Sequence, residues 1–239
     1  KSALSVYEVD SAKLAELQPT TIITQTQCDV CAVNLSDVEA ALQEIVGTNP
    51  QIVSLEPNSL DDIWDDFRRV GYALGAHGLA DALVADCQQR LTVLRTQVSR
   101  LRRLTKPTVA CIEWMDPLMA AGNWIPELVD IAGGENLFGE ARRYSSPMAF
   151  QQLQEADPEF IITMPCGFEI ERTQQEMSVL TEYEGWDQLR AVREGHVFVA
   201  DGNQYFNRPG PRVVESAEIL VEILHQIAFG YEGVGWQRL

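Results

Sequence analysis

The sequence predicts an α/β fold with two Rossmann-like lobes, each built on a mostly parallel sheet, joined by one long helix. Two observations predict this fold: a pattern that occurs twice, and an alternation of strands and helices along the second half of the chain. Segments 12–28 and 148–166 each give a short helix containing Leu-Gln, a proline, an Ile-Ile-Thr strand and a cysteine. An apolar run of this kind between a helix and a turn is typical of a strand buried on both faces of a parallel sheet.

Residues 1–78 are expected to form the first lobe. Strands are predicted around 21–24 and 51–55, and a helix is predicted after Ser59, which resembles a capping box with Asp62. Two strands are fewer than the three or more expected in the second lobe, so the first lobe is predicted to be incomplete.

The linking helix is predicted within residues 79–105. Its apolar residues are spaced by alternating threes and fours and form one stripe: Val84, Cys87, Leu91, Leu94, Val98 and Leu101. A helix from Ala80 to Leu104 would be about 37 Å long at 1.5 Å per residue, longer than a crossover in a small sheet requires. We therefore expect it to span the two lobes.

Residues 106–239 are expected to form the second lobe. Strands are predicted at 108–114, 159–164 and 196–201, and helices at 125–133, 149–156, near 185–192 and at 211–227. Alternating strands and helices indicate a mostly parallel sheet with helices on its faces.

Charge and composition narrow the classes of function. The 18 basic and 35 acidic side chains leave a net charge of −17, which argues against nucleic acid and anionic membranes as partners. No apolar run approaches the roughly 20 residues that a membrane span requires, and the first ten residues lack the features of a signal peptide. No G-x-S-x-G, P-loop or dinucleotide glycine pattern occurs, so we predict no catalytic residues and no enzyme.

The candidate ligand site lies after the strands, because ligands of open parallel sheets bind beyond the carboxyl ends of the strands. These connections share aromatic and sulfur side chains, amides and few charges, which suit a large, mostly apolar ligand with polar edges. The predicted ligand-binding residues are Gln27, Cys28, Trp114, Met115, Asn123, Trp124, Cys166, Phe168, Tyr205, Phe206 and Arg208.

The paired cysteines Cys28 and Cys31 allow several interpretations. A capping box at Ser36 starts the next helix several residues after Cys31, so the dipole-activated thiol of a redox motif is disfavoured. Structural zinc needs four ligands, and only Cys166 of the second lobe is available to join the pair, so these three thiols are weak metal candidates. Packing of one thiol beneath a ligand site and direct contact with the ligand both remain open.

Several segments together resemble a known family: "YEVDSAKLAELQPTTIITQ", the long helix, "EWMDPLMAAGNWIPELVDIAGGENLFG", "LQEADPEFIITMPCGFEIERT" and "VADGNQYFNRPGPRVVESAEILVEILH". This is the cobalamin-binding branch of the class III substrate-binding proteins of ABC importers, a superfamily that also contains ferric siderophore and haem binders. The resemblance covers nearly the whole chain. "TQTQCDVCAV", "MPCGF" and "FNRPGPR" are its most specific parts.

The resemblance implies two lobes joined by a rigid helix, a shallow cleft with little hinge closure, and delivery of the ligand to a membrane permease. It implies a periplasmic or extracytoplasmic monomer with no cofactor, for which cobalamin or a related corrinoid is the transported ligand. The family's opening strand and helix do not precede Lys1, and the lack of a signal peptide leaves a cytoplasmic location open. The alternatives are a ferric siderophore or haem binder, and a thiol-based metal-binding or trafficking protein.

Overall fold

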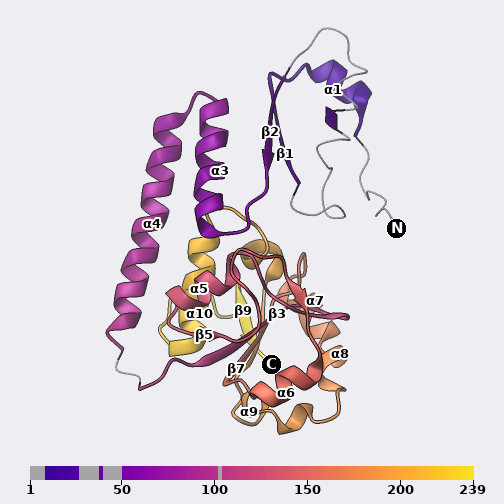
Figure 1. Cartoon of the computed structure of the whole chain (residues 1–239), viewed down its shortest axis with the longest axis vertical. Coiled ribbons are helices and arrows are strands. Elements are labelled where there is room, and N and C mark those ends of the chain that lie inside the picture. The colour runs from indigo at the N-terminus through magenta and orange to yellow at the C-terminus, as the bar shows by residue number, and fades with distance from the viewer. Residues whose placement is uncertain (1–8, 27–37, 40–49, 102–103) are drawn as a thin grey trace. The chain divides into compact units, whose positions relative to one another are not determined.

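The computed structural model of the chain describes residues 9–26, 38–39, 50–101 and 104–239 (Figure 1). The chain divides into two compact units, Lys1–Ala85 and Asp86–Leu239, and the division falls within helix α4 (His77–Ser99). The fold class is the predicted one, because the first unit holds a parallel strand pair and the second alternates parallel strands with helices. The predicted domain boundaries at 78 and 105 stay predictions.

The first unit contains helix α1 (Ser11–Leu17), strands β1 (Thr21–Gln25) and β2 (Gln51–Leu55), helix α3 (Leu60–Ala73) and the start of α4. Strands β1 and β2 are parallel and in register, with Thr21 opposite Gln51. Helix α3 begins after Ser59, whose side chain accepts a hydrogen bond from the Asp62 amide at 3.2 Å. Both predicted strands and the predicted cap are therefore confirmed.

The predicted repeat is a repeat of local structure. Helix α1 ends at Gln18, which has a left-handed φ of 43°, and helix α6 (Phe150–Ala156) ends at Asp157, which has a φ of 41°. In each case the capping residue donates its backbone N–H to the carbonyl four residues earlier, and a proline follows before the strand. This left-handed cap satisfies helix-terminal carbonyls and turns the chain into the strand.

The second unit is built on one sheet with the strand order β6-β4-β3-β7-β8-β9, and β5 also pairs with β3. Its strands are β3 (Thr108–Met115), β4 (Leu118–Ala120), β5 (Glu135–Asn136), β6 (Ser146–Pro147), β7 (Phe160–Thr163), β8 (Val197–Ala200) and β9 (Trp236–Arg238). Strands β3, β7 and β8 run parallel to one another, and β4 and β9 are antiparallel to their neighbours. The carboxyl ends of β3, β7 and β8 therefore meet at one edge of the sheet.

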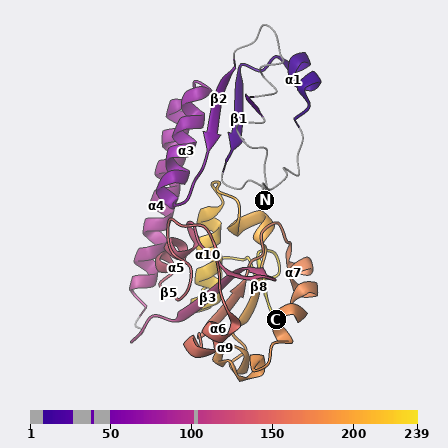
Figure 2. The same ribbon diagram turned by 45° about the vertical axis from the view of Figure 1, so that its right-hand side comes forward.

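Helices cover both faces of this sheet (Figure 1, Figure 2). Helices α5 (Ile125–Ile131) and α10 (Val213–His225) pack together on one face. The other face carries α6, α7 (Ile170–Glu176), α8 (Ser178–Thr181), α9 (Arg190–Arg193) and the short 3-10 helix Trp186–Gln188, whose apolar residues share a core with β3, β7 and β8. Strands β7 and β8 are buried along their whole length, as their unbroken apolar sequence predicts.

The linking helix is α4, which begins and ends earlier than predicted. Five residues of the predicted apolar stripe are buried, but Leu101 is exposed because the helix ends at Ser99. Ion pairs join the second half of the helix to the second unit: Arg90 to Glu218 of α10 at 2.9 Å, and Arg95 to Asp130 of α5 at 3.1 Å. No helix in the described part of the chain is both long and apolar enough to cross a bilayer.

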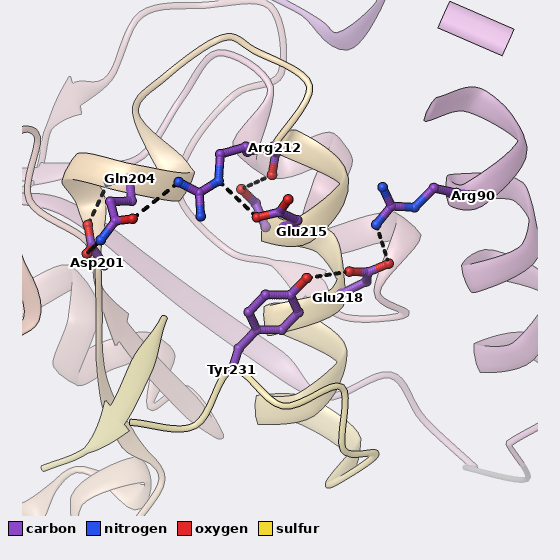
Figure 3. Close-up of polar contacts among 8 residues, drawn as sticks. Arg90, Asp201, Gln204, Arg212, Glu215, Glu218 and Tyr231 are labelled. Carbon is purple, nitrogen blue, oxygen red and sulfur yellow. Dashed lines mark hydrogen bonds and ion pairs between the residues drawn. The ribbon is translucent and has the colours of Figure 1, made fainter. Parts of the chain in front are cut away.

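The C-terminal turn is held by the buried carboxylate of Glu222, on α10. This carboxylate accepts hydrogen bonds from the backbone N–H groups of Phe229, Gly230 and Tyr231 and from the indole N–H of Trp236, the last at 2.7 Å. The Tyr231 hydroxyl donates to the Glu218 carboxylate at 2.8 Å, and this carboxylate also accepts a hydrogen bond from the Arg90 guanidinium (Figure 3). One face of α10 thus fixes both the end of the chain and the linking helix.

Candidate functional site

The segments that follow β3, β7 and β8 are joined to one another by hydrogen bonds. The Cys166 amide, after β7, donates to the Glu113 carbonyl of β3 at 3.3 Å. The Asn203 amide, after β8, donates to the Phe168 carbonyl at 3.1 Å. The end of β3 and the segments after β7 and β8 are therefore joined by hydrogen bonds at the carboxyl edge of the sheet, where the sequence predicted the ligand site.

The connection after β8 is a π-helical turn, Gly202–Phe206, where the sequence predicted a loop. Asp201 caps this turn by accepting hydrogen bonds from the Gln204 backbone and side chain, at 2.6 and 3.0 Å (Figure 3). A Cβ at Gly202 would overlap the Pro165 carbonyl oxygen, so the turn packs on the end of β7 only because this residue is glycine. π-helical turns occur frequently at functional sites.

Four predicted ligand residues are buried. Met115, Trp124, Tyr205 and Phe206 are 5%, 3%, 3% and 0% exposed, so protein contacts occupy nearly all of their surface. The Trp124 indole donates to the Phe206 carbonyl at 3.0 Å and so joins the connection before α5 to the turn after β8. These side chains lie beneath the surface, and their direct contact with a ligand stays a prediction.

Trp114 and Phe168 are only partly buried and form the aromatic part of the surface. Their ring centroids are 5.4 Å apart with an interplanar angle of 60°, and the Arg172 guanidinium lies 4.9 Å from the centre of the Phe168 ring. Together with Met115, Pro165 and Val179 they line a recess of about 180 Å³. Sequence reasoning missed Arg172, which is in the first turns of the helix after "MPCGF" and faces the same recess.

The arginines of the surface already have protein partners. Arg208 donates to the side chain of Asn203 at 2.8 Å, and Arg172 pairs with Glu176 at 2.6 Å. Arg212 pairs with Glu215 at 2.9 Å and donates to Gln204 at 3.2 Å (Figure 3). The Arg212 guanidinium also lies 4.3 Å from the centre of the Tyr205 ring. The charges of Arg172 and Arg212 are thus paired with carboxylates of the chain, whereas Arg208 is held by the neutral Asn203.

One acidic residue lies close to the surface in a desolvated position. Burial raises the pKa of the Glu113 carboxyl, and a hydrogen bond donated by the Ser145 hydroxyl at 2.6 Å opposes part of that rise. Only the folded chain places this carboxyl against Ser145, which is 32 residues away.

The cysteines of the described residues differ in exposure. Cys166 is exposed at the surface, whereas Cys87 and Cys111 are buried, and burial raises the pKa of the Cys111 thiol to about 12. No group of three or more His, Cys, Asp or Glu side chains within the described ranges is arranged to hold a metal ion. The predictions for Gln27, Cys28 and Cys31 lie outside the described residues.

The first unit has a recess of its own that the sequence did not predict. It measures about 290 Å³ and is lined by Gln51, Ile52 and Val53 of β2 and by Arg69 and Tyr72 of α3. Its described lining includes the amide of Gln51 and the aromatic ring of Tyr72.

Comparison with known proteins gives one family. The sequence profile of the family described as "Periplasmic binding protein" matches residues 1–203. The vitamin B12-binding protein of Vibrio cholerae is 22% identical over 175 residues, which are 70% of this chain and 57% of that relative. The chain therefore spans little more than half the length of the curated relatives it matches.

Solved structures agree on the fold. The periplasmic vitamin B12 binding protein BtuF of Vibrio cholerae has a TM-score of 0.63 at 20% identity, covering 90% of this chain and 78% of that one. Staphylococcus aureus IsdE, solved with haem, has a TM-score of 0.72 at 15% identity, covering 91% and 81%. At these identities the likeness shows a shared fold among proteins whose ligands differ.

Proposed function

Because the chain belongs to the periplasmic binding protein family, we propose that it is the substrate-binding component of an ABC importer and that its cargo is cobalamin or a related corrinoid. In this proposal the chain binds without catalysing a reaction, works as a monomer in the periplasm or another extracytoplasmic space, and hands its ligand to a membrane permease.

The observation that carries the proposal is the surface at the carboxyl edge of β3, β7 and β8. It offers the partly exposed rings of Trp114 and Phe168 and the exposed Cys166, with the partly buried Asn123 on a neighbouring connection. Trp124, Tyr205, Phe206 and Met115 support these connections from beneath. We expect a pair of aromatic rings with amide side chains nearby to suit a corrin ring, which has wide apolar faces and amide side chains.

The charges of the surface favour a cargo without acidic groups. Haem and many ferric siderophores present carboxylates or other anionic oxygens, which are best recognised by uncommitted arginines. Here Arg172, Arg208 and Arg212 are each engaged by protein acceptors, at distances of 2.6 to 3.2 Å. A haem or siderophore would have to break such contacts to bind, so the corrinoid is the better fit. Haem remains the second candidate, because a haem-binding protein shares the fold.

Titration calorimetry with cyanocobalamin, haemin and a ferric siderophore tests the proposal. We expect micromolar or tighter binding of cyanocobalamin and much weaker binding of the other two. Trp114→Ala should weaken cyanocobalamin binding about 5-fold, because one aromatic contact contributes on the order of 1 kcal/mol beyond its area burial.

Tyr183→Ala is the matched control, since Tyr183 is a partly exposed aromatic that stacks on Phe150 of α6, away from the strand ends. It should leave the affinity unchanged. Binding of haemin or siderophore without any corrinoid binding would refute the corrinoid as cargo and leave the proposed role as a substrate-binding protein intact. Binding of none of the three would count against the substrate-binding role itself.

A further inference from the structure

The recess lined by Trp114, Phe168 and Arg172 is too small to enclose the whole of the proposed cargo. It measures about 180 Å³, whereas pockets that enclose a drug-sized ligand measure about 300–1,000 Å³. A corrin ring with its side chains is larger than a drug-sized ligand. The recess therefore suits one part of such a ligand and not its main body.

Protein contacts hold the two aromatic residues of this recess in place. The Trp114 indole N–H donates to the Asp116 carbonyl at 2.9 Å, so its polar end needs no partner from a ligand. Phe168 is fixed through its backbone, because its N–H donates to the Pro165 carbonyl and its carbonyl accepts from the Asn203 N–H, each at 3.1 Å. The two residues therefore offer a ligand aromatic surface that is ordered before binding.

Arg172 adds a third flat group to the recess. Its guanidinium lies 4.9 Å from the centre of the Phe168 ring and pairs with the Glu176 carboxylate at 2.6 Å. Glu176 thus already compensates the charge of this guanidinium. A guanidinium also stacks on flat rings through its planar face, which the ammonium group of a lysine does not have. What Arg172 offers a ligand is therefore its plane more than its charge.

The charges around the recess disfavour an anionic group. Its lining includes the guanidinium of Arg172 and the carboxylates of Asp116 and Glu176, and the other lining residues are apolar or aromatic. The lining therefore carries a net negative charge at neutral pH. A ligand carboxylate placed here would be repelled, whereas a neutral or weakly basic ring would not.

We propose that this recess is a subsite for one flat heteroaromatic ring, neutral or weakly basic, that projects from the main body of the cargo and stacks against Trp114, Phe168 and Arg172. This inference rests on the proposed function and deepens it. In cyanocobalamin the group of this class is the benzimidazole of the nucleotide. Dicyanocobinamide lacks the nucleotide and its base but keeps the corrin ring, so the two compounds separate this subsite from the rest of the ligand surface.

The test measures the affinities of both compounds by titration calorimetry. Wild-type protein should bind cyanocobalamin at least on the order of tenfold more tightly than dicyanocobinamide, because stacking of one base on an aromatic side chain contributes about that much. Phe168→Ala should weaken cyanocobalamin binding by about tenfold and dicyanocobinamide binding by about twofold or less. The preference for cyanocobalamin should therefore be largely lost in this variant.

Arg172→Lys is the second variant, and it changes an exposed residue, so it should fold as the wild type does. Lysine keeps the charge and can still pair with Glu176, but it has no planar face. We expect it to weaken cyanocobalamin binding about threefold and to leave dicyanocobinamide binding unchanged. Arg190→Lys is the matched control, because Arg190 pairs with Glu194 four residues later at 3.0 Å and does not line the recess. It should leave both affinities unchanged.

Three results would overturn the inference. The first is equal binding of cyanocobalamin and dicyanocobinamide by wild-type protein. The second is a loss of the same size for both compounds in Phe168→Ala, which would place part of the corrin ring in the recess. The third is unchanged cyanocobalamin binding in Arg172→Lys. Each of these leaves the proposed function standing, whereas a wild-type protein that binds neither corrinoid would refute the proposed function and this inference with it.

Discussion

Replacing Glu222 by glutamine should destabilise the second unit strongly. The substitution conserves shape, but it removes the charge and replaces one acceptor oxygen by an NH₂ group. In the native chain the two carboxylate oxygens receive three backbone N–H groups, from Phe229, Gly230 and Tyr231, and the Trp236 indole. A glutamine can present only one oxygen to these four donors, so at least one donor must face another donor.

The expected loss follows from that geometry. Hydrogen bonds to a charged acceptor contribute about 1.5–3 kcal/mol each, and a buried donor left without an acceptor costs about 1–3 kcal/mol. Weakening the turn contacts and leaving the Trp236 indole unpaired should together cost about 3–5 kcal/mol. For a domain of this size 1 kcal/mol lowers the melting temperature by about 2–4 °C, so Glu222→Gln should lower it by about 6–20 °C.

Thermal unfolding followed by near-ultraviolet circular dichroism measures this effect, because Trp236 packs at the turn and contributes to the signal. The matched control is Glu215→Gln, on the same helix, where the carboxylate makes a partly exposed ion pair with Arg212. Such pairs contribute about 0–1 kcal/mol, so the control should shift the melting temperature by a few degrees at most. Equal shifts for the two variants would refute the assigned role of Glu222.

Three further outcomes are expected. Gly202→Ala should lower both stability and ligand affinity, because its Cβ would overlap the Pro165 carbonyl and displace the π-helical turn; an unchanged melting temperature would contradict this. Glu113→Gln should stabilise the protein at pH 8 and not at pH 4. Because the pKa of Glu113 is raised in the folded protein, ionising this carboxyl at a pH above its unfolded-state pKa costs free energy of folding, whereas at a pH below that pKa the carboxyl is protonated in both states. In a thiol-reagent assay of the native protein, Cys166→Ser should remove a fast-reacting thiol and Cys111→Ser should remove none. Loss of a fast-reacting thiol in Cys111→Ser would contradict this prediction.

The sequence predicted those elements whose signal is local. The runs "EFIITM" and "HVFVAD" are mostly apolar, and they form β7 and β8, which are buried along their whole length. The amphipathic pattern after Pro211 predicted α10, and the helix begins at Val213, two residues after the predicted start. Strands β5 and β6 are two residues long and exist only through pairing with distant partners, so no local pattern marks them.

The sequence predicted which connections lie at the carboxyl edge of the sheet, but not which of their side chains are exposed there. The rule that ligands bind beyond strand ends placed Trp114, Cys166 and Phe168 on one surface. The rule cannot tell which aromatic points outward, because that depends on contacts between segments such as the one from Trp124 to the Phe206 carbonyl, 82 residues apart. The same limit applies to Glu113, whose direction is set by a bulge between two strands.

The turn at Gly202–Phe206 is ordered by the chain itself. The Asn207 amide donates to the Met164 carbonyl at 2.8 Å, and Trp124 and Asp201 hold the two ends of the turn. Fixing the backbone of one residue costs about 1–2 kcal/mol of conformational entropy, and the residues of this turn are already fixed when the chain folds. A molecule that binds against this turn would lose little affinity to loop ordering. Its association should therefore proceed in a single kinetic phase that is first order in ligand concentration, without a slower ordering step of this segment.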